Sequence, residues 1–124
     1  MSSAVLLIAH GSRRPEANAD LVEIAALLRQ RGEYEIVVPS YLELAEPSIP
    51  DGARQCVAAG ATIVLMLPYF LSAGSHATTD MQRFRDELAV EYPSVRFVLC
   101  SPLGLHPLML DIVQARLNEG RSAE

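Results

Sequence analysis

The 124-residue sequence lacks several features that mark common classes of protein. It has only two cysteines, Cys56 and Cys100, and their spacing matches no metal-binding motif. No hydrophobic run approaches the roughly 20 residues that span a bilayer, and the first residues lack the order of a signal peptide. The net charge of −5 argues against binding to nucleic acid through phosphate contacts. We therefore expect a cytoplasmic protein with reduced cysteines, no membrane association and no nucleic-acid partner.

Motifs for nucleotide and nucleophile chemistry are also missing. The sequence contains neither Gly-x-Gly-x-x-Gly nor a phosphate loop ending in Gly-Lys-Ser/Thr. It has no Gly-x-Ser-x-Gly nucleophile motif either. These absences argue against dinucleotide and nucleoside triphosphate chemistry, and we expect no organic cofactor.

What the sequence does contain is a regular alternation of strand and helix signals. Half of the residues are hydrophobic, and this fraction is typical of a globular domain. Strand-like segments begin about every 30 residues, the length of a βαβ unit, near Ala4, Tyr34, Thr62 and Val95. We expect an α/β fold, a three-layer sandwich whose four-stranded parallel sheet has the flavodoxin-like order 2-1-3-4. Residues 1–120 should form a single domain and residues 121–124 a loose C-terminal end.

Helical patterns fill the intervals between the strand signals. The first helix is expected to begin near Pro15, and the second at Pro47 or Pro50. A third helix is expected to be capped by Thr78 or Thr79. A fourth is expected to begin at Pro107, with apolar residues on one face, namely Leu108, Ile112 and Ala115.

Two histidines follow apolar runs and lie beside glycines. His10 follows the apolar residues 4–9, and His76 follows the apolar residues 63–71 and then Gly74. Such runs favour parallel strands buried on both faces, whose carboxyl ends form the ligand-binding rim. Two neutral imidazoles at that rim would hold a divalent transition metal with open coordination positions. For each histidine alone, a helix cap or a satisfied core position is the alternative.

Other polar residues are expected at the same rim. Glu43 and Glu46 follow the second strand, where a carboxylate could neutralise a metal or accept a proton, or could simply be solvated. His106 follows the fourth strand, and a ligand role for it is a weaker alternative. Arg13 and Arg14 precede the first helix, where arginine can grip carboxylates or stay an ordinary exposed charge.

The loop after the third strand mixes apolar side chains, small residues and backbone N–H groups. That mixture could line a flat apolar ligand with polar edges, although an ordinary strand-to-helix loop is the alternative. The loop consists of Phe70, Leu71, Ser72, Ala73, Gly74 and Ser75.

Taken together, four segments resemble the short-form class II tetrapyrrole chelatases of the sirohydrochlorin cobaltochelatase, or CbiX, type. These segments are residues 7–13, 42–50, 68–80 and 102–107, and they span nearly the whole chain in order and spacing. The resemblance implies insertion of a divalent metal into sirohydrochlorin or a related tetrapyrrole. The product would serve corrinoid, sirohaem or nickel-tetrapyrrole biosynthesis. We expect cobalt as the metal substrate, with nickel and ferrous iron as alternatives.

The resemblance also implies roles for individual residues. His10 and His76 would bind the incoming metal, and His10 would also accept a proton. Glu46 would take part in catalysis and contact the substrate. The substrate would further meet Glu43, Arg13 and residues 70–75. Because longer members of this family carry two such domains, a chain of this size implies a homodimer.

Two other functions stay open. The first is a non-catalytic carrier of tetrapyrrole or metal on the same fold. The second is a small phosphatase that uses His10, although no arginine directly precedes that histidine.

Overall fold

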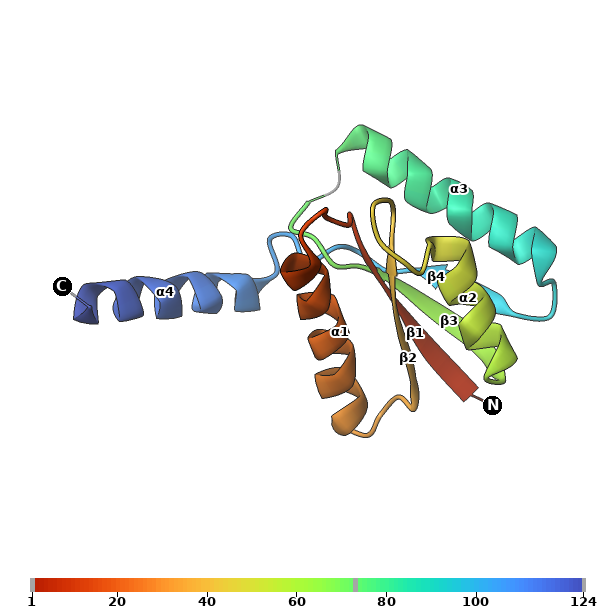
Figure 1. Ribbon diagram of the computed structural model, residues 1–124, viewed down its shortest axis with the longest axis horizontal. Helices are drawn as coiled ribbons and strands as arrows, with labels where there is room; N and C mark the ends of the chain where they lie inside the picture. Colours follow the sequence, from red (N-terminus) through yellow and green to blue (C-terminus); the bar gives the residue numbers. More distant parts are fainter. Residues whose placement is uncertain (1, 73, 124) are drawn as a thin grey trace.

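The computed structural model describes residues 2–72 and 74–123. Four strands alternate with four helices in an α/β arrangement (Figure 1). The strands are β1 (Ser2–Ala9), β2 (Ile36–Tyr41), β3 (Ala61–Pro68) and β4 (Arg96–Leu99), and the helices are α1 (Pro15–Gln30), α2 (Ile49–Ala58), α3 (Ser75–Glu91) and α4 (Pro107–Ser122). All strand pairs are parallel and their order is β2-β1-β3-β4, which confirms the predicted topology. In the part of the chain that the structure describes, no helix has the length and apolar character needed to cross a membrane.

Two apolar clusters lie on opposite faces of the sheet. On one face α1 packs against β1 and β2, and its Leu21 and Ala25 are buried there together with Val5 and Leu7. On the other face α2 and α3 cover the sheet; the buried residues of that cluster include Leu6, Ile8, Ile49, Ala53, Cys56, Val64, Met66, Met81 and Leu88. Strand β1 is therefore buried on both faces, as its continuous apolar run predicts.

The carboxyl ends of three strands meet at one edge of the sheet. Pairing continues just past the strand ends, because Leu42 N donates to Ala9 O at 2.9 Å and Tyr69 N donates to Ile8 O at 2.6 Å. The loops that follow β1, β2 and β3 therefore leave from the same rim. This is the rim on which the sequence analysis expects the candidate site.

Helix α3 begins earlier than predicted. It starts at Ser75, with Gly74 as its N-cap, rather than at Thr78 or Thr79. The first apolar residue that packs inward is Met81, so the first turn and a half carries no periodic signal. As a result His76 lies in the first turn of a helix and not in a loop.

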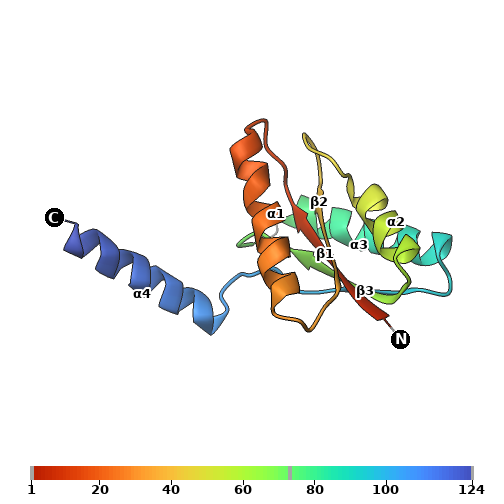
Figure 2. The ribbon, with the colours of Figure 1, turned by 60° about the horizontal axis from the view of Figure 1, so that its bottom comes forward.

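Helix α4 differs most from the expected packing. It begins at Pro107 as predicted, but it extends away from the sheet and has no buried residue (Figures 1 and 2). It also continues to Ser122, so residues 121 and 122 are helical rather than part of a loose end. On the side of the sheet that α1 occupies, Ile63 and Leu65 of β3 stay partly exposed. The prediction that the third strand is buried on both faces therefore fails at Ile63 and Leu65, which no helix of the described residues buries, whereas Leu67 packs against the cluster under α1.

Candidate active site

The loop that carries His10 packs directly on the loop that carries Glu43. Glu43 N donates to His10 O at 3.1 Å. Between them Gly11 has a φ of +93°, and a Cβ at this position would overlap the Glu43 carbonyl oxygen. Only glycine satisfies both the backbone conformation and the close approach. The backbone of Gly11 thus fixes the separation of the two loops.

Helix α1 secures the other end of the His10 loop. Ser12 N donates to the Asn18 side-chain oxygen at 2.9 Å, and Asn18 Nδ2 donates back to Ser12 O at 2.8 Å. The Tyr41 hydroxyl donates to Asn18 O at 2.7 Å, which ties the same turn to β2. Burial raises the pKa of Tyr41 above its usual range, so the hydroxyl remains a donor. The loop is held at both ends while His10 itself stays exposed.

His10 also contacts the loop that follows β3. The centroids of the His10 and Phe70 rings lie 4.5 Å apart, with the planes tilted by 32°. Ring pairs at this separation attract each other, and the contact restricts the orientation of an exposed imidazole. Phe70 therefore links the end of β1 to the loop predicted to bind the substrate.

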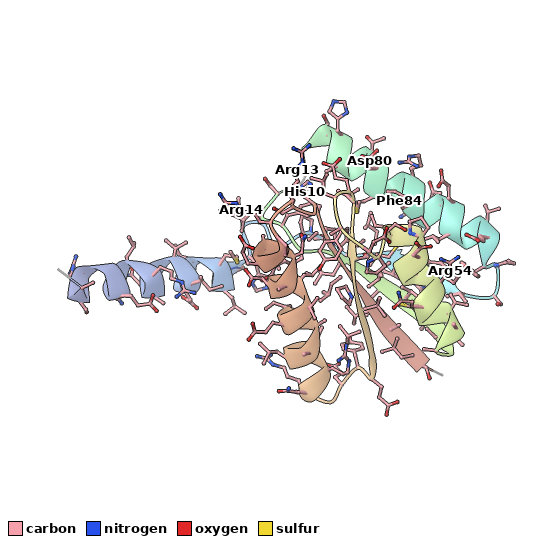
Figure 3. The ribbon with its side chains drawn as sticks, in the orientation of Figure 1. His10, Arg13, Arg14, Arg54, Asp80 and Phe84 are labelled. Atoms are coloured by element: carbon pink, nitrogen blue, oxygen red, sulfur yellow. The ribbon has the colours of Figure 1, made fainter. Side chains whose placement is uncertain are left out.

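A hollow of about 490 Å³ brings both candidate ligands together. Its walls come from the ends of β1 and β2 and from the first three turns of α3: His10, Leu42, Glu43, Gly74, His76, Ala77, Asp80, Arg83 and Phe84. Figure 3 shows His10 and Asp80 on the same side of the molecule. The hollow therefore combines two imidazoles and two carboxylates from three elements.

Sequence reasoning missed Asp80. Because α3 already includes His76, the two residues are four positions apart and lie on one helix face. Arg83 is one turn further, 3.6 Å from the Asp80 carboxylate, and its guanidinium lies 4.6 Å from the centre of the Phe84 ring. The spacing between His76 and Asp80 could have been found, had the helix been predicted to begin at Ser75.

Several predicted site residues lie outside this hollow. Glu46 and Arg13 are exposed and do not line it; Glu46 precedes a cis peptide bond to Pro47. Leu71 and Ser72 instead line a second hollow of about 700 Å³ at the start of α4. Of the remaining loop residues, Gly74 lines the first hollow, Ser75 is exposed at the start of α3, and Ala73 falls outside the described residues.

His106 has a structural position. It is the N-cap of α4, and its Nδ1 accepts a hydrogen bond from Leu108 N at 3.1 Å. It lines the second hollow and not the one that contains His10 and His76. His106 therefore caps a helix, the role that the sequence analysis considered as the alternative for His10.

The side chains that line the first hollow suit transient binding of a metal ion. Imidazole nitrogens accept cobalt, nickel and ferrous iron alike, and carboxylates that line the same hollow can offset the charge of the ion. Within residues 2–72 and 74–123, no three His, Cys, Asp or Glu side chains are grouped closely enough to enclose a metal ion. Cys56 and Cys100 are free thiols, and burial raises the pKa of the Cys56 thiol to about 11.

The CbiX family model matches residues 4–120. The chain belongs to the CbiX family. It is 38% identical over 116 residues to the chloroplastic sirohydrochlorin ferrochelatase of Arabidopsis thaliana, covering 94% of this chain and 52% of that protein. It is 30% identical over 140 residues to a sirohydrochlorin cobaltochelatase of Methanococcus maripaludis, covering 93% of this chain and 97% of that protein. The chain thus spans about half the length of the plant relative and nearly all of the archaeal one.

A solved sirohydrochlorin chelatase structure has the same fold. The sirohydrochlorin chelatase SirB of Bacillus subtilis subspecies spizizenii, solved in complex with cobalt, superposes with a TM-score of 0.87 at 29% identity. The match covers 96% of this chain and 51% of that one. Both the predicted fold and the family resemblance are therefore confirmed.

Proposed function

We propose that this protein inserts a divalent metal ion into sirohydrochlorin or a closely related tetrapyrrole. The observation that carries the proposal is the hollow in which His10 and His76 lie together with two carboxylates. The names of the relatives, sirohydrochlorin ferrochelatase and cobaltochelatase, support the same reaction. The metal is a substrate here, and no organic cofactor takes part.

The proposed reaction exchanges two pyrrole protons for one metal ion. The imidazoles of His10 and His76 hold the metal through nitrogen lone pairs and release it to the four ring nitrogens. Glu43 and Asp80 line the same hollow and offset the charge of the ion. Two pyrrole N–H bonds break as nitrogen–metal bonds form. His10, once it has released the metal, accepts the first proton and passes it to solvent, and a carboxylate that lines the hollow accepts the second. The metal, two protons and the ring balance without any redox step.

The substrate would contact residues outside the hollow. Phe70 and Leu71 offer apolar surface to the ring, and the small residues Ser72 and Gly74 leave room for its polar edges. Arg13, exposed on the same loop as His10, can meet a ring carboxylate with two donors. Glu46 lies farther along its loop than Glu43, and we assign it to handling of the substrate rather than to the metal.

We further propose that the active form is a homodimer in the cytoplasm. A tetrapyrrole is wide, and a single small domain provides walls mainly on one side of it. A sirohydrochlorin ferrochelatase of Bacillus subtilis, of which this chain spans 46%, is long enough to contain two such domains. Two copies of this chain would enclose the ring in the same way, and two-fold pairing is the commonest soluble assembly.

Cobalt is the metal that we propose, and ferrous iron and nickel must be tested beside it. The relatives are named for cobalt and for iron, and imidazole ligands accept all three ions.

The experiment mixes purified protein with sirohydrochlorin and Co²⁺, Ni²⁺ or Fe²⁺ without oxygen and follows the visible spectrum against an uncatalysed control. Faster metal insertion supports the proposal. Binding of both ligands with no rate above the control would identify a carrier instead. Hydrolysis of a phosphate ester without metal, lost in His10→Ala and kept in His76→Ala, would identify a phosphatase.

A further inference from the structure

Arg83 brings a positive charge to the hollow that contains His10 and His76. Among the described residues that line this hollow, Arg83 is the only lysine or arginine. A guanidinium repels an incoming divalent cation, and it has no lone pair with which to bind one. The presence of Arg83 at this place therefore calls for a role other than metal binding.

Two acidic neighbours on α3 engage only part of the bonding capacity of Arg83. Its Nη2 lies 3.6 Å from the Asp80 carboxylate, and its Nη1 donates to Glu87 Oε1 at 3.4 Å. Charge-assisted hydrogen bonds of this kind are normally about 2.7–2.9 Å long, so both contacts are weak. A guanidinium also has more N–H donors than these two contacts engage. The remaining donors are available to a ligand in the hollow.

An aromatic ring holds the guanidinium at the wall of the hollow. The central carbon of the Arg83 guanidinium lies 4.6 Å from the centre of the Phe84 ring, a distance at which a cation and a ring face attract each other. Phe84 packs in turn against the apolar cluster under α2 and α3, so the ring is a fixed support. Figure 3 labels Phe84 and Asp80 on α3, one helical turn apart. The Arg83 side chain is 51% exposed, so a ligand can reach it.

Helix α3 places Arg83 at a distance from the histidines that suits the rim of a tetrapyrrole. His76, Asp80 and Arg83 are spaced by four and then three residues, so they share one helix face. From His76 to Arg83 the helix rises about 10 Å. A tetrapyrrole receives its metal at the central nitrogens and carries its carboxylates at the rim. A ring whose centre lies at the histidines therefore extends with a carboxylate toward Arg83.

We propose that Arg83 binds a carboxylate at the rim of the tetrapyrrole and so favours rings that carry an acid group at that position. The inference rests on the proposed function, because it assigns a substrate contact within the same site. The planar guanidinium can meet the two oxygens of a carboxylate with two parallel N–H groups. This contact replaces the long one to Asp80 and leaves the Asp80 charge to the metal ion. Arg83 thus determines how the ring binds and does not bind the metal.

Equilibrium dialysis of metal-free sirohydrochlorin without oxygen tests the contact, with visible absorbance as the measure of free tetrapyrrole. We expect Arg83→Met to raise the Kd for sirohydrochlorin about tenfold, because the charge is lost while an apolar stem remains. Arg83→Lys should raise the Kd less, since it keeps the charge but not the planar fork. The matched control is Arg85→Met on the same helix, because Arg85 pairs with Asp86 at 3.0 Å and does not line the hollow.

Two further measurements separate binding of the ring from binding of the metal. In a titration with Co²⁺ alone, Arg83→Met should bind the ion at least as tightly as the wild type, because a repelling charge is gone. In the insertion assay the same variant should raise the KM for the tetrapyrrole and leave kcat near the wild-type value.

Each of the following results overturns the inference. An unchanged Kd for sirohydrochlorin in Arg83→Met would mean that Arg83 holds no carboxylate of the ring, and weaker Co²⁺ binding with that unchanged Kd would make it only a partner that positions Asp80. Equal losses in Arg83→Met and Arg85→Met would reduce the effect to general charge attraction. A wild type that binds no sirohydrochlorin would leave Arg83 without this ligand. If Arg83→Met does not fold by circular dichroism, Arg83→Gln replaces it with the same expected direction.

The dialysis needs no metal, so the inference and the proposed function can fail separately. Metal insertion by the wild type together with an unchanged Kd in Arg83→Met would contradict the inference alone. Binding of sirohydrochlorin without any insertion would contradict the proposed function, and the comparison of Arg83→Met with Arg85→Met would still decide the role of Arg83.

Discussion

Gly11 and Glu43 touch through their backbones, with no room for a Cβ on Gly11 beside the Glu43 carbonyl oxygen. These residues lie on the loops after β1 and β2. Glu43 lines the hollow that contains the two histidines, and Gly11 directly follows His10, which also lines it. The spacing of His10 and Glu43 is therefore set by main-chain packing rather than by their flexible side chains.

Gly11→Ala is expected to disturb both stability and metal insertion. The added methyl group must displace the Glu43 backbone, and alanine also resists a φ of +93°. Gly60→Ala is the matched control, because Gly60 has a φ of +100° but a Cβ added there would meet no atom within 4 Å. Urea unfolding should give a loss of about 1 kcal/mol for the control, from backbone conformation alone. Gly11→Ala should lose clearly more and should also insert metal more slowly. Equal losses in the two variants would mean that the loops can separate freely.

His10→Ala and His76→Ala should each slow metal insertion by about 100-fold or more while the protein stays folded. Both side chains are exposed at the rim, so their removal leaves the core intact. His106→Asn is the control, because asparagine preserves the N-cap of α4 and His106 lies outside the hollow. Initial rates from the visible spectrum, with circular dichroism as the check on folding, measure the effect. A near wild-type rate in either alanine variant would remove that histidine from the metal site.

Titration of the protein with Co²⁺ alone should distinguish the roles of the three carboxylates at the rim, Glu43, Glu46 and Asp80. Glu43→Gln and Asp80→Asn remove charges that face the hollow, so each should weaken Co²⁺ binding to the protein. Glu46→Gln, outside the hollow, should leave Co²⁺ binding unchanged and raise the KM for the tetrapyrrole. Asp86→Asn, an exposed carboxylate farther along α3, is the control for a general loss of negative charge. Weaker Co²⁺ binding in Glu46→Gln would instead make Glu46 a metal ligand.

The sheet could be predicted from the sequence because its signals are local. The uninterrupted apolar run of β1 is buried on both faces, and strand starts about 30 residues apart leave room for right-handed crossovers. His10 and His76 follow from the same logic, since loops after neighbouring parallel strands leave from one rim. None of this requires knowledge of side-chain contacts.

What the sequence could not predict depends on longer-range packing. Asp80 was missed because the first turn of α3 is polar and gives no periodicity, so the start of the helix was predicted too late. The apolar face of α4 was predicted, but periodicity tells only that a face needs cover and not which surface supplies it. The partial exposure of Leu65 has the same cause, because a strand pattern does not record whether a helix lies over it.

The buried thiol of Cys56 predicts a loss of stability at alkaline pH. Cys56 lies on the buried side of α2 and is 0% exposed, and burial raises its pKa from an ordinary 9.0 to about 11 in the folded chain. A folded-state pKa above the unfolded one means that the stabilisation is complete below pH 9. It is lost as the pH rises toward 11, because the unfolded thiol then ionises first. Two pKa units correspond to about 3 kcal/mol.

Urea unfolding at pH 8, 9, 10 and 11 measures this loss in the wild type and in Cys56→Ala. Tyrosines and other groups that titrate in this range are shared by both proteins, so the difference between the two curves isolates the thiol. We expect Cys56→Ala to be less stable at pH 8, because of the small cavity left by the sulfur, and to lose less stability on going to pH 11. Parallel curves would show that the Cys56 thiol ionises as easily in the folded protein as in the unfolded one, which would contradict the close packing of Cys56 between α2 and the sheet.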